Sequence, residues 1–255
     1  MVEPIRSVQR ALAILRLLAE VRKPLGVAEV AQATGLPPAT AHRLLVTLVE
    51  EGWADQDPQS TQYELGSDIL GTAAVALAYS PFIQSAKATL SDISELSGLN
   101  SYLGVRVGHR VAYLASARGR DGHDSKFRVG VVEQAHAIAD GKVLLAYLDP
   151  AVFRALYAGR EQLRSFTPKT ITTVDALERE LSEVRARGYA MDRGERVEGW
   201  SWVSVPVRGR RGRVVAAIVA GGQDTVATPE KLNWLAHEMR IAAEQLSIRL
   251  GFAEE

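Results

Sequence analysis

The sequence has no cysteine, no long apolar run and no excess of charge, and each absence excludes a class of protein. Without cysteine the chain can form no disulfide, no thiol nucleophile and no metal site with sulfur ligands. No run approaches the roughly 18 apolar residues that a membrane span needs. The N-terminus also lacks the charged-then-apolar pattern of a signal peptide. We therefore expect a cytoplasmic protein with no membrane partner.

The charge balance gives no sign of a nucleic-acid partner. Thirty basic and thirty acidic residues cancel over the chain. The first 66 residues hold six Lys and Arg against eight Asp and Glu, a formal balance of −2. A DNA-binding form of this region would have to place a few arginines locally and multiply them by oligomerisation.

Signatures of common enzyme classes are also missing. There is no GxSxG elbow, no HExxH pair, no Walker phosphate loop and no GxGxxG after a strand. The five histidines are scattered, and none has a second metal ligand at helical spacing. We accordingly expect no enzyme activity, no cofactor and no metal.

The stretch 27–52 carries the clearest structural pattern in the chain. Apolar residues at helical spacing end at Gly35, which can take the positive φ that lets a helix stop and the chain turn. Pro37 and Pro38 follow, and proline is tolerated only in a first helical turn. The next helix places four apolar side chains on one face, at i, i+3, i+4 and i+7: Ala41, Leu44, Leu45 and Leu48.

The opposite face of this second helix is polar near its N-terminal end. At about 100° per residue, Ala39 and Arg43 lie opposite the apolar stripe. One flank carries Thr40 and Thr47, and the other carries His42. A helix held by its back in this way fits the major groove of DNA, which is about 12 Å wide. A helical hairpin that serves as core or as a protein contact would show the same pattern.

Two short strands after this helix favour the DNA-binding interpretation. Residues 53–55 and 63–66 have strand-like composition and enclose a polar run, which predicts an exposed turn. A strand pair directly after the second helix is the wing of a winged helix-turn-helix. We therefore expect such a domain over residues 1–66, with a first helix at 6–20 packed behind the helical hairpin.

The composition changes after residue 66. Residues 67–79 are alanine-rich and Pro81 prevents the helix from continuing, so we expect a linker helix, with a plain core helix as the alternative. Residues 80–255 then predict an α+β domain, an antiparallel sheet with helices against it. The expected strands are 101–106, 110–117, 126–129, 200–207 and 213–220, and the expected helices are 82–96, 140–149, 150–158, 174–187 and one starting at Pro229.

Three features of this second region are candidates for a ligand site. Residues 136–142, HAIADGK, begin a helix whose N–H groups would suit an anion, or they form a loop entering a core helix. Asp192, between a helix and the next strand, is either a pocket acid or a turn residue. Trp200 and Trp202 have the same parity on one strand, so they share a face of the core or of a cavity.

The order of these features resembles the IclR family of bacterial transcriptional regulators over roughly residues 5–250. The matching stretches are IRSVQRALAIL, GLPPATAHRLLVTLVEEGW, HAIADGKVLLA, RGYAMDRGERVEG and VSVPVRGRRGRVVAAIVAGG. The resemblance implies a DNA-binding head, a GAF-like domain for a small-molecule effector and oligomerisation, and a homodimer or dimer of dimers on a palindromic operator of double-stranded DNA. Because repression relieved by a metabolite is the commonest behaviour in the family, we expect a repressor.

The resemblance also assigns residues to both sites. In the reading helix the family usually has a lysine, a serine and a threonine, where this chain has Pro38, Ala39 and Thr40. Contact with DNA is therefore expected to depend on Thr40, His42, Arg43 and Thr47. The effector positions that the resemblance implies are Ala139, Asp140, Asp192, Trp202, Val219 and Gly221, with His136 just before them.

Only the aspartate at 192 matches the usual effector contacts of the family. Because Trp202, Val219 and Gly221 replace small polar residues, a small acid such as glyoxylate would meet too few donors. We expect a bulkier or less polar effector, aromatic or an amine donor to Asp192, unless Trp202 fills the pocket and the regulator needs no ligand. The alternative function is a metabolite-binding protein or enzyme whose winged head is only an interaction surface, and a third is a purely structural module.

Overall fold

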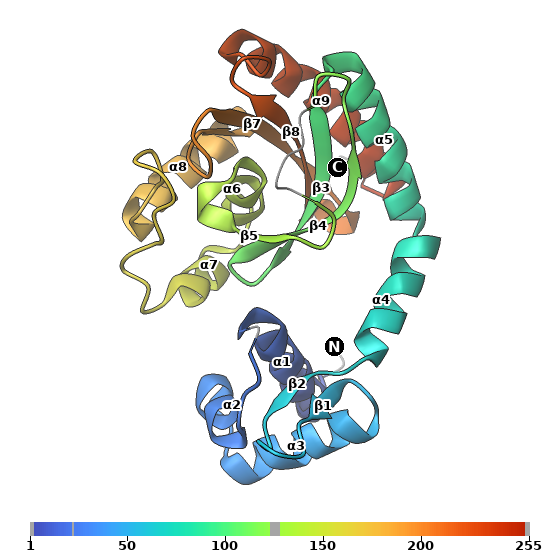
Figure 1. Ribbon diagram of the computed structural model, residues 1–255, viewed down its shortest axis with the longest axis vertical. Coiled ribbons are helices and arrows are strands. Elements are labelled where there is room, and N and C mark those ends of the chain that lie inside the picture. Colours follow the sequence, from blue (N-terminus) through green and yellow to red (C-terminus); the bar gives the residue numbers. More distant parts are fainter. Residues whose placement is uncertain (1–2, 22, 123–127, 253–255) are drawn as a thin grey trace. The chain divides into compact units, whose positions relative to one another are not determined.

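The computed structural model describes residues 3–21, 23–122 and 128–252, and the chain divides into two compact units, Met1–Tyr79 and Ser80–Glu255 (Figure 1). Each unit has its own cluster of buried apolar side chains. The first unit contains α1 (Arg6–Val21), α2 (Val27–Thr34), α3 (Pro38–Glu50), β1 (Ala54–Gln56), β2 (Tyr63–Leu65) and α4 (Asp68–Tyr79).

The first three helices and the β1–β2 pair form the expected winged helix-turn-helix. Gly35 ends α2 with φ +66°, and the N–H of Leu36 donates to the Ala31 carbonyl at 3.0 Å, which closes the turn before α3. Ile14 of α1, Val30 of α2 and Leu45 of α3 are fully buried against one another in a single cluster. The predicted glycine turn and apolar stripe are therefore confirmed.

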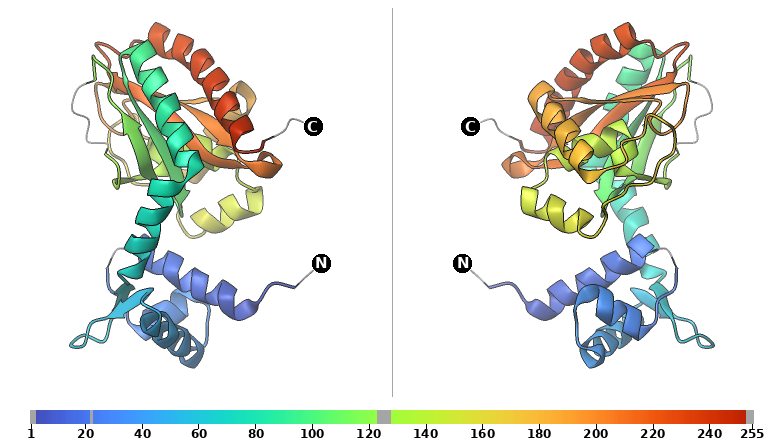
Figure 2. Two further views of the ribbon diagram at one scale, coloured as in Figure 1. Left: turned by 90° about the vertical axis from the view of Figure 1, so that its right-hand side faces the viewer. Right: turned by 90° about the vertical axis from the view of Figure 1, so that its left-hand side faces the viewer.

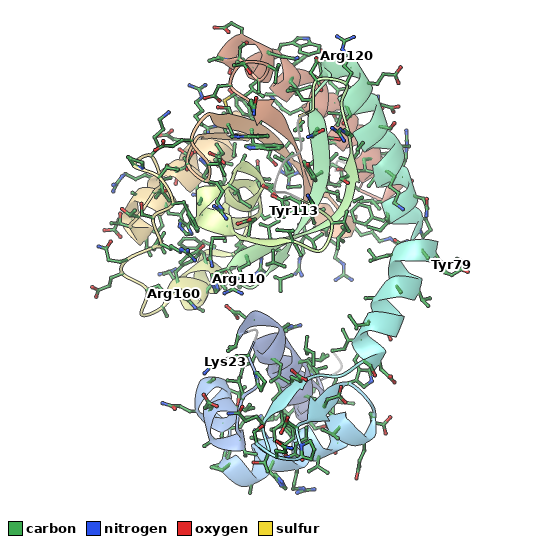
Figure 3. All side chains as sticks on the ribbon, in the orientation of Figure 1. Lys23, Tyr79, Arg110, Tyr113, Arg120 and Arg160 are labelled. Carbon is green, nitrogen blue, oxygen red and sulfur yellow. The ribbon has the colours of Figure 1, made fainter. Side chains whose placement is uncertain are left out.

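Helix α4 has no buried residue in this chain. Tyr79 at its end projects outward and is 81% exposed (Figure 3). Ser80 then caps α5 (Pro81–Ser97), which begins the second unit. Among the described residues no single helix is long and apolar enough to cross a membrane, although α4 and α5 pass that test together as a bent pair. Four apolar side chains of α5 are buried in the second unit: Ile83, Ala86, Leu90 and Ile93.

The second unit is built on one antiparallel sheet with helices on both faces. Its six strands run in the order β5-β4-β3-β8-β7-β6. Figures 1 and 2 show α5 and α9 on one face and α6 and α8 on the other. The bounds are β3 (Asn100–Val107), β4 (Arg110–Ala117), β5 (Val132–Gln134), η1 (Ala135–Ala137), α6 (Ala139–Ala146), α7 (Pro150–Tyr157), α8 (Val174–Arg187), β6 (Ala190–Arg193), β7 (Trp200–Arg208), η2 (Arg210–Gly212), β8 (Val214–Gln223) and α9 (Pro229–Arg249).

Two expectations about the strands are wrong. Of the strand expected at 126–129, residues 126 and 127 lie outside the described residues, Arg128 and Val129 are not in a strand, and the strand that pairs with β4 is β5. Asp192 lies on strand β6 and not in a connection. Four residues are too few to show alternation, so only the pairing of β6 with β7 reveals this edge strand.

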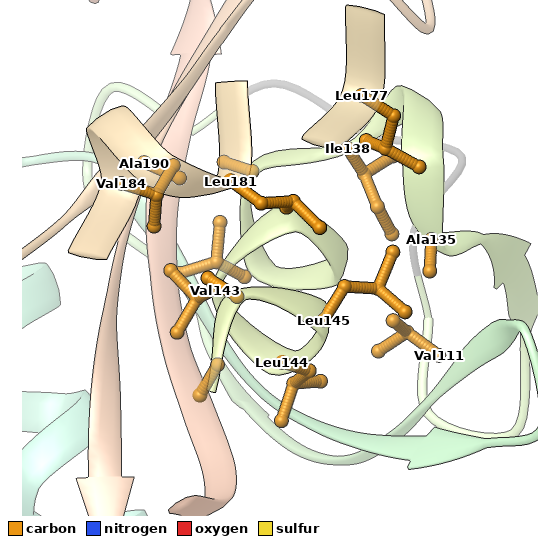
Figure 4. Packing of buried hydrophobic residues seen from close by; sticks show 14 of the residues in the cluster. Val111, Ala135, Ile138, Val143, Leu144, Leu145, Leu177, Leu181, Val184 and Ala190 are labelled. Carbon is orange, nitrogen blue, oxygen red and sulfur yellow. The ribbon is translucent and has the colours of Figure 1, made fainter. Parts of the chain in front are cut away.

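Helix α6 is buried on all sides, with every one of its eight residues enclosed. It packs between the sheet and α8. Figure 4 shows Val143, Leu144 and Leu145 of α6 close to Leu181 of α8 and Val111 of β4. Because α6 is fixed from both sides, its N-terminal residues are held in a defined position against the sheet.

Candidate functional site

The exposed side of α3 carries the residues expected to meet DNA. Its other side packs on α1, α2 and β1 through Ala41, Leu45 and Leu48, with Leu44 half-buried beside them. Thr40 is half-buried, and the other five candidates are exposed: Pro38, Ala39, His42, Arg43 and Thr47. The amphipathic pattern predicted for this helix is therefore confirmed.

Arg43 and Thr47 lie one turn apart on the exposed face of α3. The Thr47 hydroxyl donates a 3.1 Å hydrogen bond to the Arg43 carbonyl, which leaves the hydroxyl oxygen as an acceptor. The Arg43 guanidinium forms no ion pair with a described residue, so it can reach a phosphate or the acceptor edge of a guanine. Val46, 37% exposed beside them, adds an apolar surface of the kind that meets a thymine methyl group.

The wing is held in shape by hydrogen bonds at both ends. At its base, Leu25 and Tyr63 exchange backbone bonds of 2.9 and 2.8 Å, which adds a third short segment to the β1–β2 pair. At its tip, the Asp57 carboxylate accepts the N–H groups of Ser60 at 2.7 Å and Gln59 at 2.8 Å. These two bonds lower the pKa of Asp57, which keeps the turn charged and ordered.

The candidate effector residues gather on the sheet face that α6 covers. Asp192 on β6 pairs directly with Trp202 on β7, and Val219 on β8 pairs with Tyr102 on β3. Eight residues line one cavity there: Tyr102, Tyr113, Ile138, Ala139, Asp140, Asp192, Trp202 and Val219. The structure therefore brings together five of the seven residues that the sequence named.

Three aromatic rings line this cavity. The indole of Trp202 is 3% exposed, and it meets the ring of Tyr102 edge-on with a centroid distance of 5.8 Å. The ring of Tyr113 lies 5.4 Å from that of Tyr102 on the other side. Trp200 stacks on Trp202 at 6.0 Å and 9°, which confirms that the two share a face. About 200 Å³ of empty space is left, none of it wide enough for a water molecule.

Asp140 is a fully enclosed carboxyl in the first turn of α6. Its Oδ1 accepts a long 3.5 Å hydrogen bond from the hydroxyl of Tyr113, which Figure 3 shows inside the second unit, and its Oδ2 has no partner. Burial raises the pKa of Asp140 to about 7, because the charged form is deprived of water. Gly104 on β3 makes the space, since a Cβ there would lie 2.6 Å from Oδ2.

Asp192 faces the same cavity from the edge of the sheet. Its Oδ1 accepts the N–H of Glu195 at 2.6 Å. Burial raises the pKa of Asp192 to about 7, with Glu195 adding to the rise and Lys142 opposing it. Lys142 is itself buried on α6, bonded to Glu195 at 2.5 Å and 3.6 Å from Glu180, so it connects α6 to the β6–β7 connection and to α8.

Two of the named effector residues do not line the cavity. His136 is buried in η1, where its Nε2 pairs with the Arg164 carbonyl at 2.9 Å, and burial lowers its pKa. Gly221 lies on β8 beside Trp202, where a Cβ would come within 2.7 Å of the indole, so glycine leaves room for the ring. In the described part of the chain no three His, Asp or Glu side chains are placed to hold a metal ion.

Sequence reasoning missed Tyr102, Tyr113 and Ile138. The strands at 101–106 and 110–117 were predicted, and pairing them as a hairpin would have placed both tyrosines on neighbouring strands. A β-bulge between Leu103 and Gly104 shifts the register, however, and decides which side chains face α6. Only the structure shows that the two rings meet.

An exposed helix backed by a wing, together with a separate α+β unit that encloses a cavity, defines a winged-helix DNA-binding regulator with a ligand-sensing domain. Two family profiles match the chain: the IclR helix-turn-helix domain over residues 7–58 and the bacterial transcriptional regulator IclR C-terminal domain over residues 74–248. The chain belongs to the IclR family of bacterial transcriptional regulators.

Similar proteins span the whole chain. The HTH-type transcriptional regulator XynR of Escherichia coli is 33% identical over 248 residues, 97% of this chain and 98% of that protein. The glycerol operon regulatory protein of Streptomyces coelicolor is 35% identical over 253 residues, 98% of each chain. The crystal structure of the Agobacterium tumefaciens repressor BlcR superposes with a TM-score of 0.63 and 28% identity, covering 99% of this chain and 100% of that chain. The chain is thus a DNA-binding transcriptional regulator and not an enzyme.

Proposed function

We propose that the protein is a repressor whose affinity for its operator is set by a small-molecule effector. In this proposal residues 1–66 bind DNA, residues 67–79 link the domains, and residues 80–255 bind the effector and carry oligomer contacts. One of the similar structures is a repressor, which supports this role. Bacterial DNA lies in the cytoplasm, which supports a cytoplasmic location.

The observation that carries the proposal is the division of α3 into a buried back and an exposed polar front. Pro38 and Ala39 have small side chains at the start of α3, so the backbone there can come close to the floor of the groove. In this proposal His42, Arg43 and Thr47 supply donors and acceptors to the bases, and the half-buried Thr40 contacts a phosphate.

We infer a homodimer on a palindromic operator from the surface of the first unit. Helix α4 leaves Leu70 73%, Val75 60% and Tyr79 81% exposed. The outer side of α1 leaves Val8 and Leu12 exposed as well. Water-exposed apolar side chains in this number mark a contact surface, and a second copy of the same helices would cover them symmetrically.

We place the effector-binding site in the cavity between α6 and the sheet. Its walls are mostly aromatic and aliphatic, which supports an effector that is bulkier or less polar than glyoxylate. Because the space beside Trp202 is too narrow for a water molecule, a ligand can enter only if a wall residue moves, and we assign that movement to the indole. That movement offers a way to transmit binding to β7, which carries the indole, and to β6 and β8, which pair with β7 on its two sides.

The test is operator binding by Arg43→Ala, measured by fluorescence anisotropy on a duplex selected from random DNA by the wild-type protein. Loss of a guanine or phosphate contact in each subunit should weaken binding at least about tenfold. The matched control is Arg179→Ala, which removes the same charge from the exposed face of α8 and should leave binding unchanged. Equal affinity of Arg43→Ala and wild type would favour a head that serves only as a protein contact.

A further inference from the structure

The ionic groups around the effector cavity do not balance. Five carboxyl groups lie close enough there to raise one another's pKa, and two of them are in the cavity wall. The other three are each matched by a cation: Glu133 by Arg196 at 2.8 Å, Glu180 by Arg187 at 2.7 Å, and Glu195 by Lys142 at 2.5 Å. The two aspartates of the wall, Asp140 and Asp192, have no cation of their own among the described residues.

Asp140 also has spare capacity to accept a hydrogen bond. Oδ2 of Asp140 is buried without any partner. Asp192 accepts the N–H of Glu195 at its Oδ1, and a backbone hydrogen bond from Arg196 also lowers its pKa. Lys142 lowers the pKa of Asp192 through its charge, but its ammonium group is bonded to Glu195. A buried acceptor without a donor costs free energy, so a ligand that brings N–H or O–H donors is favoured at this position.

The rest of the wall suits a positive charge. Three aromatic rings surround the aspartates, from Tyr102, Tyr113 and Trp202, and the remaining lining residues are apolar. Ring faces attract cations, most of all when water is excluded. Among the described residues no Lys, Arg or His side chain lines the cavity, so nothing there would neutralise an anionic ligand.

We propose that the effector is a small organic cation, a protonated amine whose N–H groups donate to Asp140 and Asp192 inside the aromatic wall. This inference rests on the proposed effector-responsive function and names the charge of the ligand. A carboxylate ligand would lie against two buried acids, and like charges at short range disfavour each other. The displaced indole of Trp202 then packs on the apolar part of the amine.

Two ligand pairs of equal shape and opposite charge test the proposal: benzylammonium against benzoate, and butylammonium against butyrate. Binding is measured by calorimetry on the wild type and on Trp202→Ala, which removes the indole from the cavity. We expect each ammonium to bind at least about tenfold more tightly than its carboxylate partner. Where Trp202→Ala fails to fold, Trp202→Phe serves in its place.

The direction of proton transfer gives a second readout. An ammonium ion stabilises the ionised aspartates, lowers their pKa and releases protons near pH 7, whereas a carboxylate would cause proton uptake. Calorimetry in two buffers of different ionisation enthalpy shows whether ligand binding releases or takes up protons. The variants Asp140→Asn and Asp192→Asn should each lose most of the preference for the ammonium and most of the proton release.

The proposal is overturned by tighter binding of benzoate or butyrate, by a larger effect of Mg²⁺ or Zn²⁺ than of either amine, or by no binding to the wild type and the opened variant alike. Operator binding is measured in parallel without ligand. A protein that binds its operator but prefers carboxylates retains the proposed regulatory function and loses only this inference. A protein that binds the amines but no DNA loses the regulatory function instead.

Discussion

Burial, more than any neighbouring charge, determines the chemistry of Asp140 and Asp192. Both have a pKa of about 7, against an ordinary value of 3.8, and loss of water is the largest cause in each. The HAIADGK motif and the aspartate at 192 could be selected from the sequence, since both lie in stretches that resemble the family. Their shared cavity could not, because it depends on the pairing of β6 with β7 and on the position of α6.

The raised pKa values predict how stability depends on pH. Between about pH 4 and pH 7 the folded protein keeps protons on these aspartates that the unfolded chain has lost, so the free energy of unfolding falls as pH rises through this window. Asp140→Asn removes one of these titrations. Relative to wild type the variant should gain about 1–3 kcal/mol at pH 8 and little at pH 4, measured by urea unfolding. Asp92→Asn, an exposed change on α5, should give the same pH profile as wild type, and an identical profile for Asp140→Asn would contradict the account.

At the level of secondary structure, prediction succeeded where the signal is local. The glycine stop at Gly35, the four-residue apolar stripe of α3 and the helix expected at 174–187 depend on neighbouring residues, and these helices begin and end close to where expected. Edge strands β5 and β6 were misplaced or missed, since three or four residues carry no periodicity of their own. Such strands are defined by partners far away in the sequence.

Gly35 offers a test of the turn that orients α3. Its φ of +66° is unfavourable for any residue with a Cβ, although nothing lies within 4 Å of the position. Gly35→Ala should therefore lower stability by about 1 kcal/mol and reduce the melting temperature of the first unit. The matched change Gly71→Ala, within helix α4 and equally free of contacts, should leave the melting temperature unchanged or raise it. An unchanged melting temperature for Gly35→Ala would show that the turn does not need glycine.

The exposed apolar side chains of helix α4 lead to a prediction about the assembly state. Val75→Glu places a charge in the apolar surface that we assign to a second copy, so it should shift the wild-type oligomer to lower mass in light scattering. Val152→Glu on α7, where the valine is 47% exposed, is the matched control and should not change the mass. Retention of the full mass by Val75→Glu would place the contact elsewhere.

Considered as a whole, the molecule keeps the two tasks of a regulator apart. The first unit holds six Lys and Arg against nine Asp and Glu, a formal charge of −3, so affinity for DNA must come from a few well-placed side chains repeated by symmetry and not from a general field. The second unit has a large buried core and encloses Asp140 and Asp192, two aspartates that have no cation of their own among the described residues, so a ligand can change their ionisation.

The most direct measurement is protection of guanine N7 from dimethyl sulfate on the selected operator. If α3 enters the major groove, the wild-type protein should protect a guanine in each half-site, and Arg43→Ala, added at a concentration that saturates the DNA, should lose that protection while the flanking positions stay covered. Absence of major-groove protection under wild-type saturation, or an unchanged pattern with Arg43→Ala, would contradict the assignment of α3 as the helix that reads the operator.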